Sequence, residues 1–152
     1  MKKIIILLLA LQFSGFVIGQ ELNSFSVKFN HVALSVKDVN VSAEFYKNAL
    51  KLEEITNRTE MDGIRWLSLG DGKELHLVSL LKDEVKINKA VHFALSTSEF
   101  DSFISELDKM KIEYSDWPGI PNKITDRAEG IKQVYFQDPD GYWIEVNSVI
   151  QE

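Results

Sequence analysis

The chain has 152 residues and no cysteine, and its 23 acidic residues outnumber its 17 basic residues, which gives a formal net charge of −6. The lack of cysteine excludes disulfides, thiol nucleophiles and cysteine-based metal sites. The acidic balance argues against nucleic acids and anionic membranes as partners. The length of the chain predicts one domain.

The first 19 residues have the order of a secretory signal peptide. A basic start is followed by the apolar run Ile4 to Leu11, and small residues lead up to Gly19. The apolar run is too short and too interrupted to span a membrane comfortably. We expect cleavage after residue 19 and a tail over residues 20–25. The mature protein would then be periplasmic or secreted and would not span a membrane.

The first half of the remaining chain predicts a strand, a helix and three more strands. Residues 26–36 alternate between two faces, as a half-buried strand does. Asp38 is placed to cap a helix, whose predicted apolar stripe contains Val41, Phe45, Ala49 and Leu52. The further strands, with a tight turn at residues 70–72, are expected over residues 53–59, 64–69 and 74–80.

The second half repeats this order. After a strand over residues 90–96, we expect Ser98 to cap a helix with an apolar stripe of Phe100, Phe103, Ile104, Leu107 and Met110. Further strands are predicted near residues 112–114 and over residues 131–137 and 143–149, with a DPDG turn between the last two. Residues 26–81 and 89–150 are thus predicted to be two β-α-β-β-β modules of an α+β fold, made by internal duplication.

The three histidines lie at strand positions that correspond between the two predicted modules. His31 in FNHVALSV and His92 in VHFALSTS occupy the same place in the first strand of each half. His76 lies in the last strand of the first half, and Glu145 holds the matching position in the second. Each lies on the strand face opposite the residues expected to pack against a helix.

Three imidazoles and one carboxylate in a concave, partly buried pocket are costly unless they are paired or bind a metal. An isolated polar residue is the better interpretation of any single strand histidine, but the matched phase of all three favours a metal site. This donor set suits one divalent transition metal, with positions left for water or substrate. We therefore predict as metal ligands His31, His76, His92 and Glu145. Whether the metal is Zn, Ni, Mn, Co or Fe stays open.

The chain resembles the vicinal oxygen chelate superfamily, the glyoxalase, bleomycin-resistance and extradiol-dioxygenase group, in the phrases FNHVALSVKDVNVSAEFYKNALKLEEI, GDGKELHLVSL, VHFALS and VYFQDPDGYWIEV. The resemblance covers about residues 26–149. It implies paired modules that form a cupped mixed sheet around a divalent metal, with helices on the outer face. It puts the family's ligands on the same four residues. Members commonly form homodimers, and some build each site across the interface.

Two departures from the family pattern bear on this expectation. Lys51 stands where many relatives have the glycine of Leu-Gly-Leu, so it must take a left-handed conformation or the helix must end differently. Glyoxalase I enzymes generally carry a carboxylate at the position of His76. The two facing glutamates of that chemistry are therefore reduced here to Glu145 and an imidazole.

The resemblance implies a glyoxalase-like or epimerase-like lyase or isomerase, akin to lactoylglutathione lyase, that acts through a metal-chelated enediolate of a small oxygen-rich substrate. Glu145 is the expected catalytic base, and His76 can also move protons. One alternative is an iron-dependent extradiol dioxygenase, whose two-histidine, one-carboxylate centre a fourth ligand would crowd. The other is a non-catalytic binding protein of the resistance type. Export makes glutathione adducts a doubtful substrate.

Other side chains are candidates for binding the substrate. Trp143 shares the face of the predicted carboxylate ligand, Arg65 is a candidate contact for an anionic substrate, and Trp117 lies in a loop that can form a lid. A solvated arginine and a structural tryptophan are the alternatives for the last two. Glu74 is either a partner of the nearest predicted ligand or an exposed edge carboxylate.

Overall fold

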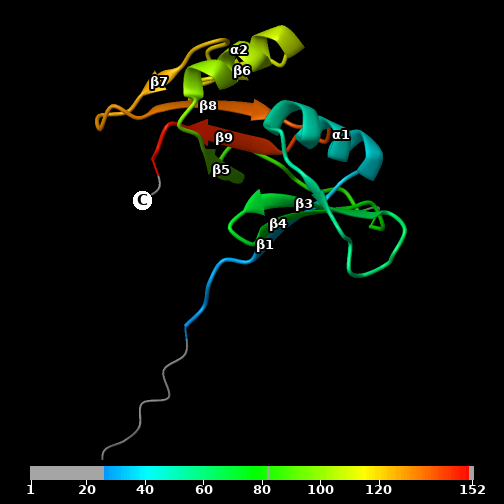
Figure 1. The fold of residues 1–152 in the computed structure, drawn as a ribbon. Helices are drawn as coiled ribbons and strands as arrows, with labels where there is room; N and C mark the ends of the chain where they lie inside the picture. Colours follow the sequence, from blue (N-terminus) through cyan, green and yellow to red (C-terminus); the bar gives the residue numbers. More distant parts are fainter. Residues whose placement is uncertain (1–25, 82, 151–152) are drawn as a thin grey trace, which may run out of the picture.

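The computed structural model describes residues 26–81 and 83–150, which form two modules of the same design (Figure 1). Module one, residues 26–81, contains β1 (His31–Ser35), α1 (Val39–Leu50), β2 (Glu54–Ile55), β3 (Ile64–Gly70) and β4 (Lys73–Val78). Module two, residues 89–150, contains β5 (His92–Ser96), α2 (Phe100–Met110), β6 (Tyr114–Ser115), β7 (Thr125–Asp126), β8 (Lys132–Gln137) and β9 (Trp143–Asn147). The predicted α+β class and the duplication are confirmed.

The predicted signal peptide and tail lie outside the described residues. No helix in the described part of the chain has the length and apolar character needed to cross a membrane.

Each module forms a sheet of its own. The order in module one is β1-β4-β3-β2, with β1 parallel to β4. Module two repeats it as β5-β9-β8-β6, with β5 parallel to β9 and the short, unpredicted β7 also paired to β8. The described chain thus has two sheets where the resemblance implied one cup. Among the described residues, β1 and β5 each have a strand on one side only.

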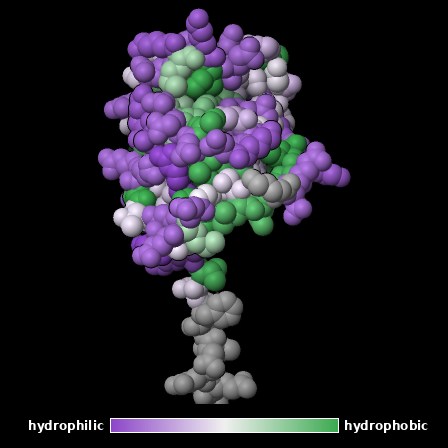
Figure 2. Space-filling model, turned by 90° about the vertical axis from the view of Figure 1, so that its right-hand side faces the viewer, coloured by the Kyte–Doolittle hydropathy of each residue, from purple (hydrophilic) through white to green (hydrophobic). Residues whose placement is uncertain are grey.

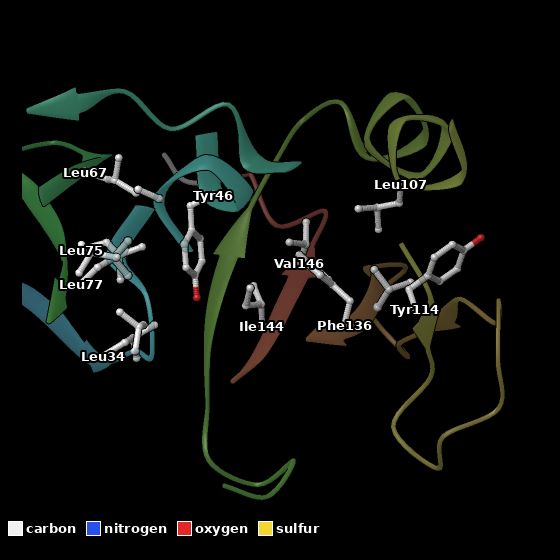
Figure 3. Packing of buried hydrophobic residues seen from close by; sticks show 14 of the residues in the cluster. Leu34, Tyr46, Leu67, Leu75, Leu77, Leu107, Tyr114, Phe136, Ile144 and Val146 are labelled. Atoms are coloured by element: carbon white, nitrogen blue, oxygen red, sulfur yellow. The ribbon is translucent and has the colours of Figure 1, made fainter. Parts of the chain in front are cut away.

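A single apolar core joins the two sheets. Its buried members include, from module one, Leu34, Leu75 and Leu77 and, from module two, Ile144 and Val146. Tyr46 of α1 stands between these two groups and is fully buried (Figure 3). Its hydroxyl donates a hydrogen bond of 2.7 Å to Asp138 in the β8–β9 turn. Helix α1 therefore packs against both modules, and the core side of each sheet faces the other.

Helix α1 begins where the sequence predicts. The carboxylate of Asp38 accepts hydrogen bonds from the backbone N–H groups of Asn40 at 2.8 Å and Val41 at 3.3 Å, which satisfies two N–H groups of the first turn. The predicted apolar stripe was wrong at Val41, whose side chain is 55% exposed. The buried face includes Ser42 instead, because its hydroxyl donates to Asp140 at 2.8 Å. Lys51 ends the helix in the left-handed conformation, with φ of 55°.

Helix α2 differs from the prediction at its start. It begins at Phe100, and its N-cap residue is Glu99, whose side chain makes no capping hydrogen bond. The predicted cap at Ser98 is wrong. The hydroxyl of Thr97 accepts a hydrogen bond of 3.1 Å from the backbone N–H of Glu99 just before the helix. The predicted stripe is confirmed at Phe100 and Leu107, which are both buried, but it is wrong at Met110, which is 37% exposed.

The strand predicted over residues 53–59 is reduced to the two residues of β2. Asn57 ends it, because its side-chain oxygen accepts from the backbone N–H of Thr59 at 2.9 Å. Its amide nitrogen also donates to the carbonyl of Ile64 at 3.0 Å. This local turn replaces the ladder hydrogen bonds that a longer strand would need.

Candidate metal centre

The module-one donors lie on the sheet face that is turned away from the core. His76 lies between the buried Leu75 and Leu77 in β4, so its side chain points to the opposite face. His31 from β1 stacks on it with ring centroids 4.3 Å apart. Trp66 from β3 stacks on its other side at 4.0 Å, with the ring planes 5° apart. We call His31 and His76 half-site one.

Hydrogen bonds give the two imidazoles of half-site one different roles. The Nδ1 of His31 is 2.7 Å from the side-chain oxygen of Asn30, so a proton on Nδ1 leaves Nε2 free as a metal donor. The Nε2 of His76 is instead 2.7 Å from a carboxylate oxygen of Glu74. Arg58 donates to the other oxygen of Glu74 at 2.6 Å. His76 therefore has only Nδ1 left for a metal.

Glu74 is a partner of His76 and not an exposed edge carboxylate. Its side chain is only 12% exposed. The hydrogen bond with His76 is the main reason that the pKa of Glu74 is lowered, and the positive charge of Arg58 adds to the effect. The carboxylate thus stays ionised and orients the imidazole.

Arg65 does not line the donor face. It is the neighbour of Trp66 in β3, and the strand alternation puts it on the opposite side of the sheet. There its guanidinium binds Glu54 through two hydrogen bonds of 2.7 and 2.5 Å and reaches Asn40 of α1 at 3.2 Å. The prediction that Arg65 contacts substrate beside the histidines therefore does not hold, because ion pairing keeps it on the helix side.

The module-two donors also face away from the core. The Nδ1 of His92 is 2.9 Å from the backbone carbonyl of Lys89. Because a carbonyl only accepts, Nδ1 carries the proton and Nε2 is left as a donor atom for a metal. Glu145 lies between the buried Ile144 and Val146, and one of its oxygens is 3.4 Å from the Nε2 of His92. We call His92 and Glu145 half-site two.

Two neighbours fix the carboxylate of Glu145. The hydroxyl of Tyr135 donates to Oε2 at 2.7 Å, and the amide of Asn147 donates to Oε1 at 2.9 Å. Burial raises the pKa of Tyr135, and the hydrogen bond to Glu145 raises it further, so the phenol remains a donor. Sequence reasoning missed both neighbours, although Asn147 is visible as the next residue along the same strand face.

Trp117 and Trp143 lie near half-site two, as the sequence suggested. The ring centroid of Trp117 is 6.1 Å from that of His92 and 5.5 Å from that of Tyr135. Trp143 pairs with His92 across the β5–β9 ladder. The ammonium of Lys89 lies over the rings of Trp117, Tyr135 and Trp143. Contact of either tryptophan with a substrate stays a prediction.

The two half-sites do not meet within one chain. Each lies on the outer face of its sheet, and the shared core separates them. Among residues 26–81 and 83–150, no three histidine, aspartate or glutamate side chains come together as a group able to hold a metal ion. The donors are of the types that bind divalent metals, but one chain presents them as two separate pairs. The four-ligand site stays a prediction.

Residues 28–146 match the family model of the Glyoxalase/Bleomycin resistance protein/Dioxygenase superfamily, and the chain belongs to this superfamily. It is 28% identical over 124 residues to the metallothiol transferase FosB of Staphylococcus epidermidis strain ATCC 12228, which covers 78% of this chain and 80% of that protein. It is 27% identical over 124 residues to the uncharacterized protein YwbC of Bacillus subtilis strain 168, over 78% of this chain and 94% of YwbC.

Solved structures share the fold. The oxidase ChaP-H2 matches with a TM-score of 0.67 and 23% identity, over 83% of this chain and 96% of the oxidase. The lactoylglutathione lyase of Agrobacterium tumefaciens matches with a TM-score of 0.61 and 17% identity, over 81% of this chain and 94% of the lyase. At these identities the likeness concerns the architecture and carries no substrate.

Proposed function

We propose that this chain is an exported, metal-dependent enzyme that binds a small substrate through two neighbouring oxygens. The observation that carries the proposal is the matched orientation of His31 and His92. In each, an oxygen acceptor faces Nδ1, and Nε2 remains available on the donor face. Histidines that bind metals in proteins are commonly oriented by such a bond. Membership of the superfamily supports the same conclusion.

His31, His92 and Glu145 would hold the metal, with His76 as a further ligand through Nδ1. Since the two half-sites face away from each other, one complete centre needs half-site one of one copy and half-site two of a second copy. The proposed active form is therefore a homodimer with two such centres. This arrangement brings together all four predicted ligands without unfolding the shared core.

The free sheet edges support a dimer. β1 and β5 are equal in length, HVALS and HFALS, and strands with open edges are templates for pairing with another chain. The apolar residues just before them, Phe29 and Val91, are 62% and 61% exposed. A groove of about 760 Å³ runs beside β5, with apolar side chains such as Phe93 and Leu95 in its wall. Figure 2 shows apolar side chains interrupting an otherwise hydrophilic surface.

The metal would supply Lewis-acid polarisation of the two substrate oxygens. Glu145 is then the carboxylate placed to take a proton from a carbon beside a polarised carbonyl, at Oε1 or Oε2, as a glyoxalase-like or epimerase-like lyase or isomerase requires. Tyr135 and Asn147 keep this carboxylate in one position. His76 would serve as the second group that moves a proton.

A second candidate is transfer of a thiol to a polarised substrate, and the hydrogen bonds around the donors favour it. Tyr135 and Asn147 already donate hydrogen bonds to the two oxygens of Glu145, and Glu74 occupies the Nε2 of His76, so the atoms that would move a proton are engaged with other partners. A thiolate that enters already deprotonated needs no base from the protein. Since the chain has no cysteine, the thiol would come from a second substrate. The similarity to FosB supports this candidate.

Elemental analysis of the mature protein tests the metal. We expect about one divalent ion per chain in the wild type, strong loss in Glu145→Ala and no loss in the control Glu113→Ala, an exposed carboxylate that belongs to neither half-site. Full metal content in Glu145→Ala would reject the ligand assignment.

Activity assays on the same metal-loaded samples separate the reaction classes. Hemithioacetal isomerisation supports the lyase or isomerase, metal-dependent thiol consumption supports the transferase, and oxygen uptake with catechols supports a dioxygenase. Tight binding of small molecules with none of these activities would favour a binding protein.

Export is tested by N-terminal sequencing of the protein produced with its full N-terminus in a bacterial host. We expect a periplasmic or secreted protein that begins at Gln20. A cytoplasmic product that retains Met1 would reject export.

A further inference from the structure

The side chain of Lys89 is held in a fixed place at the border of half-site two. Its ammonium donates to the hydroxyl of Ser115 at 3.0 Å and to the backbone carbonyl of Asp116. It lies 4.7 Å from the ring centroid of Tyr135 and 4.8 Å from that of Trp143. These rings also border the donors, since Tyr135 is hydrogen-bonded to Glu145. The position of the charge is therefore set by four neighbours from three segments.

This ammonium has no carboxylate partner among the described residues. The nearest acidic side chain that acts on it is Asp116, but that carboxylate is engaged elsewhere. It pairs with Lys123 at 3.0 Å and accepts from the backbone N–H groups of Gly119 and Ile120 at 2.9 and 2.8 Å. The acceptors of Lys89 are a neutral hydroxyl and a neutral carbonyl, which leave one N–H of the ammonium for another partner.

A half-buried positive charge without an anion is costly. Burial is the main reason that the pKa of Lys89 is lowered, and the more distant charge of Asp116 offsets only part of this effect. Aromatic faces stabilise the ammonium but do not neutralise it. The border of half-site two therefore carries an electropositive spot that an incoming anion would complement.

We propose that Lys89 binds an anionic group of the substrate, so that the enzyme acts on a small organic acid that also carries two neighbouring oxygens. The ring of Tyr135 lies between the two parts of this site, 5.4 Å from the ring of His92. A compound of a few carbon atoms can thus contact the metal ligands and Lys89 together. The inference rests on the proposed function, because it places the anion next to the proposed metal centre.

The test compares pairs of compounds that share a vicinal diol and differ in charge. Glycerate is paired with glyceramide, and glycerol 3-phosphate is paired with glycerol, which separates a carboxylate from a phosphate. In the metal-loaded wild type, we expect calorimetry to show about tenfold tighter binding of at least one anion than of its neutral counterpart. Lys89→Met should abolish this preference and Lys89→Arg should keep most of it. The matched control Lys86→Met, an exposed lysine of the same linker, should leave it unchanged.

A purely structural role for Lys89 predicts another pattern. If the lysine only holds the loop through its hydrogen bonds to Ser115 and Asp116, Lys89→Met should weaken the binding of the anion and of the neutral compound by the same factor. That result would overturn the inference, as would a metal-loaded wild type that shows no anion preference or binds none of the four compounds. Metal content measured on the same samples keeps the two proposals apart. If the protein takes up no metal during loading but still prefers the anion through Lys89, the metal centre is rejected and the anion site is retained.

Discussion

Modules one and two share the strand order and the place of their donors, but they surround those donors differently. In module one the carboxylate, Glu74, supports an imidazole and is bound by Arg58. In module two the carboxylate, Glu145, stands among the predicted ligands and is fixed by two neutral donors. The two modules thus share the backbone that presents two donor side chains. The residues around each pair differ, so the carboxylate orients an imidazole in module one and is itself a predicted ligand in module two.

The difference also extends to charge. The guanidinium of Arg58 lies over Trp66 beside half-site one and is neutralised by Glu74. The ammonium of Lys89 lies over aromatic rings beside half-site two and has no carboxylate partner in the described chain. The same pairing of a cation with aromatic rings therefore supports a predicted ligand in module one and leaves an unbalanced charge in module two.

The largest effect is expected from exchanging the two carboxylates for amides. Glu145→Gln should lower metal affinity by at least about 100-fold, because it removes a ligand oxygen charge. Glu74→Gln should lower it by about 10-fold, because it only weakens the orientation of His76. Calorimetric titration of the metal into both variants measures the contrast, and equal losses would show that the two modules are not specialised in this way.

The two histidines of half-site one sharpen the comparison. His31→Ala should cost about 100-fold in metal affinity, since the Nε2 of His31 is free for coordination. His76→Ala should cost only about 10-fold, because its Nε2 is already bonded to Glu74. Elemental analysis after dialysis against a weak chelator ranks the variants. A greater loss in His76→Ala would mean that Glu74 releases the imidazole when a metal binds.

The hydrogen bond that links the modules is tested by Tyr46→Phe. Removing the hydroxyl leaves a buried oxygen of Asp138 without its donor, and we expect the free energy of unfolding to fall by about 1–3 kcal/mol. The matched change Tyr142→Phe removes a partly exposed bond to the carbonyl of Ser35 and should cost less, about 0.5–1.5 kcal/mol. Urea denaturation compares the two, and a smaller loss for Tyr46→Phe would contradict the shared core.

The smallest difference concerns the helix starts. Asp38→Ala should destabilise the protein by about 1 kcal/mol, because the capping carboxylate of α1 is lost. Ser98→Ala should change stability by less than about 0.5 kcal/mol, because α2 does not use that side chain as its N-cap. Thermal unfolding of both variants checks the ranking. Equal effects would place the cap of α2 at Ser98 after all.

Strand phase could be predicted from the sequence because it depends on neighbours along the chain. Alternation put His76 and Glu145 on the faces opposite buried leucine, isoleucine and valine, and the structure agrees. The cap at Asp38 and the left-handed Lys51 could be predicted for the same reason. Arg65 lies on the helix side instead, because adjacent residues of a strand point to opposite faces and Trp66 lies on the donor face.

Features made by distant segments could not be predicted this way. Whether the two sheets share a core or form one cup depends on how α1 packs between them, and periodicity does not encode that packing. The surroundings of Lys89 combine a loop with β8 and β9, so no local pattern indicates them. The candidate ligands could be named from the sequence, but their division into two half-sites required the fold.

Complementation between two variants that bind metal poorly tests the central claim that a second copy completes each centre. His31→Ala and Glu145→Ala should each hold little metal alone. When equal amounts are unfolded and refolded together, about half of the dimers are mixed, and each mixed dimer contains one intact centre. The account predicts recovery of about one quarter of the wild-type metal content. A refolded mixture as poor in metal as its two parents would contradict it.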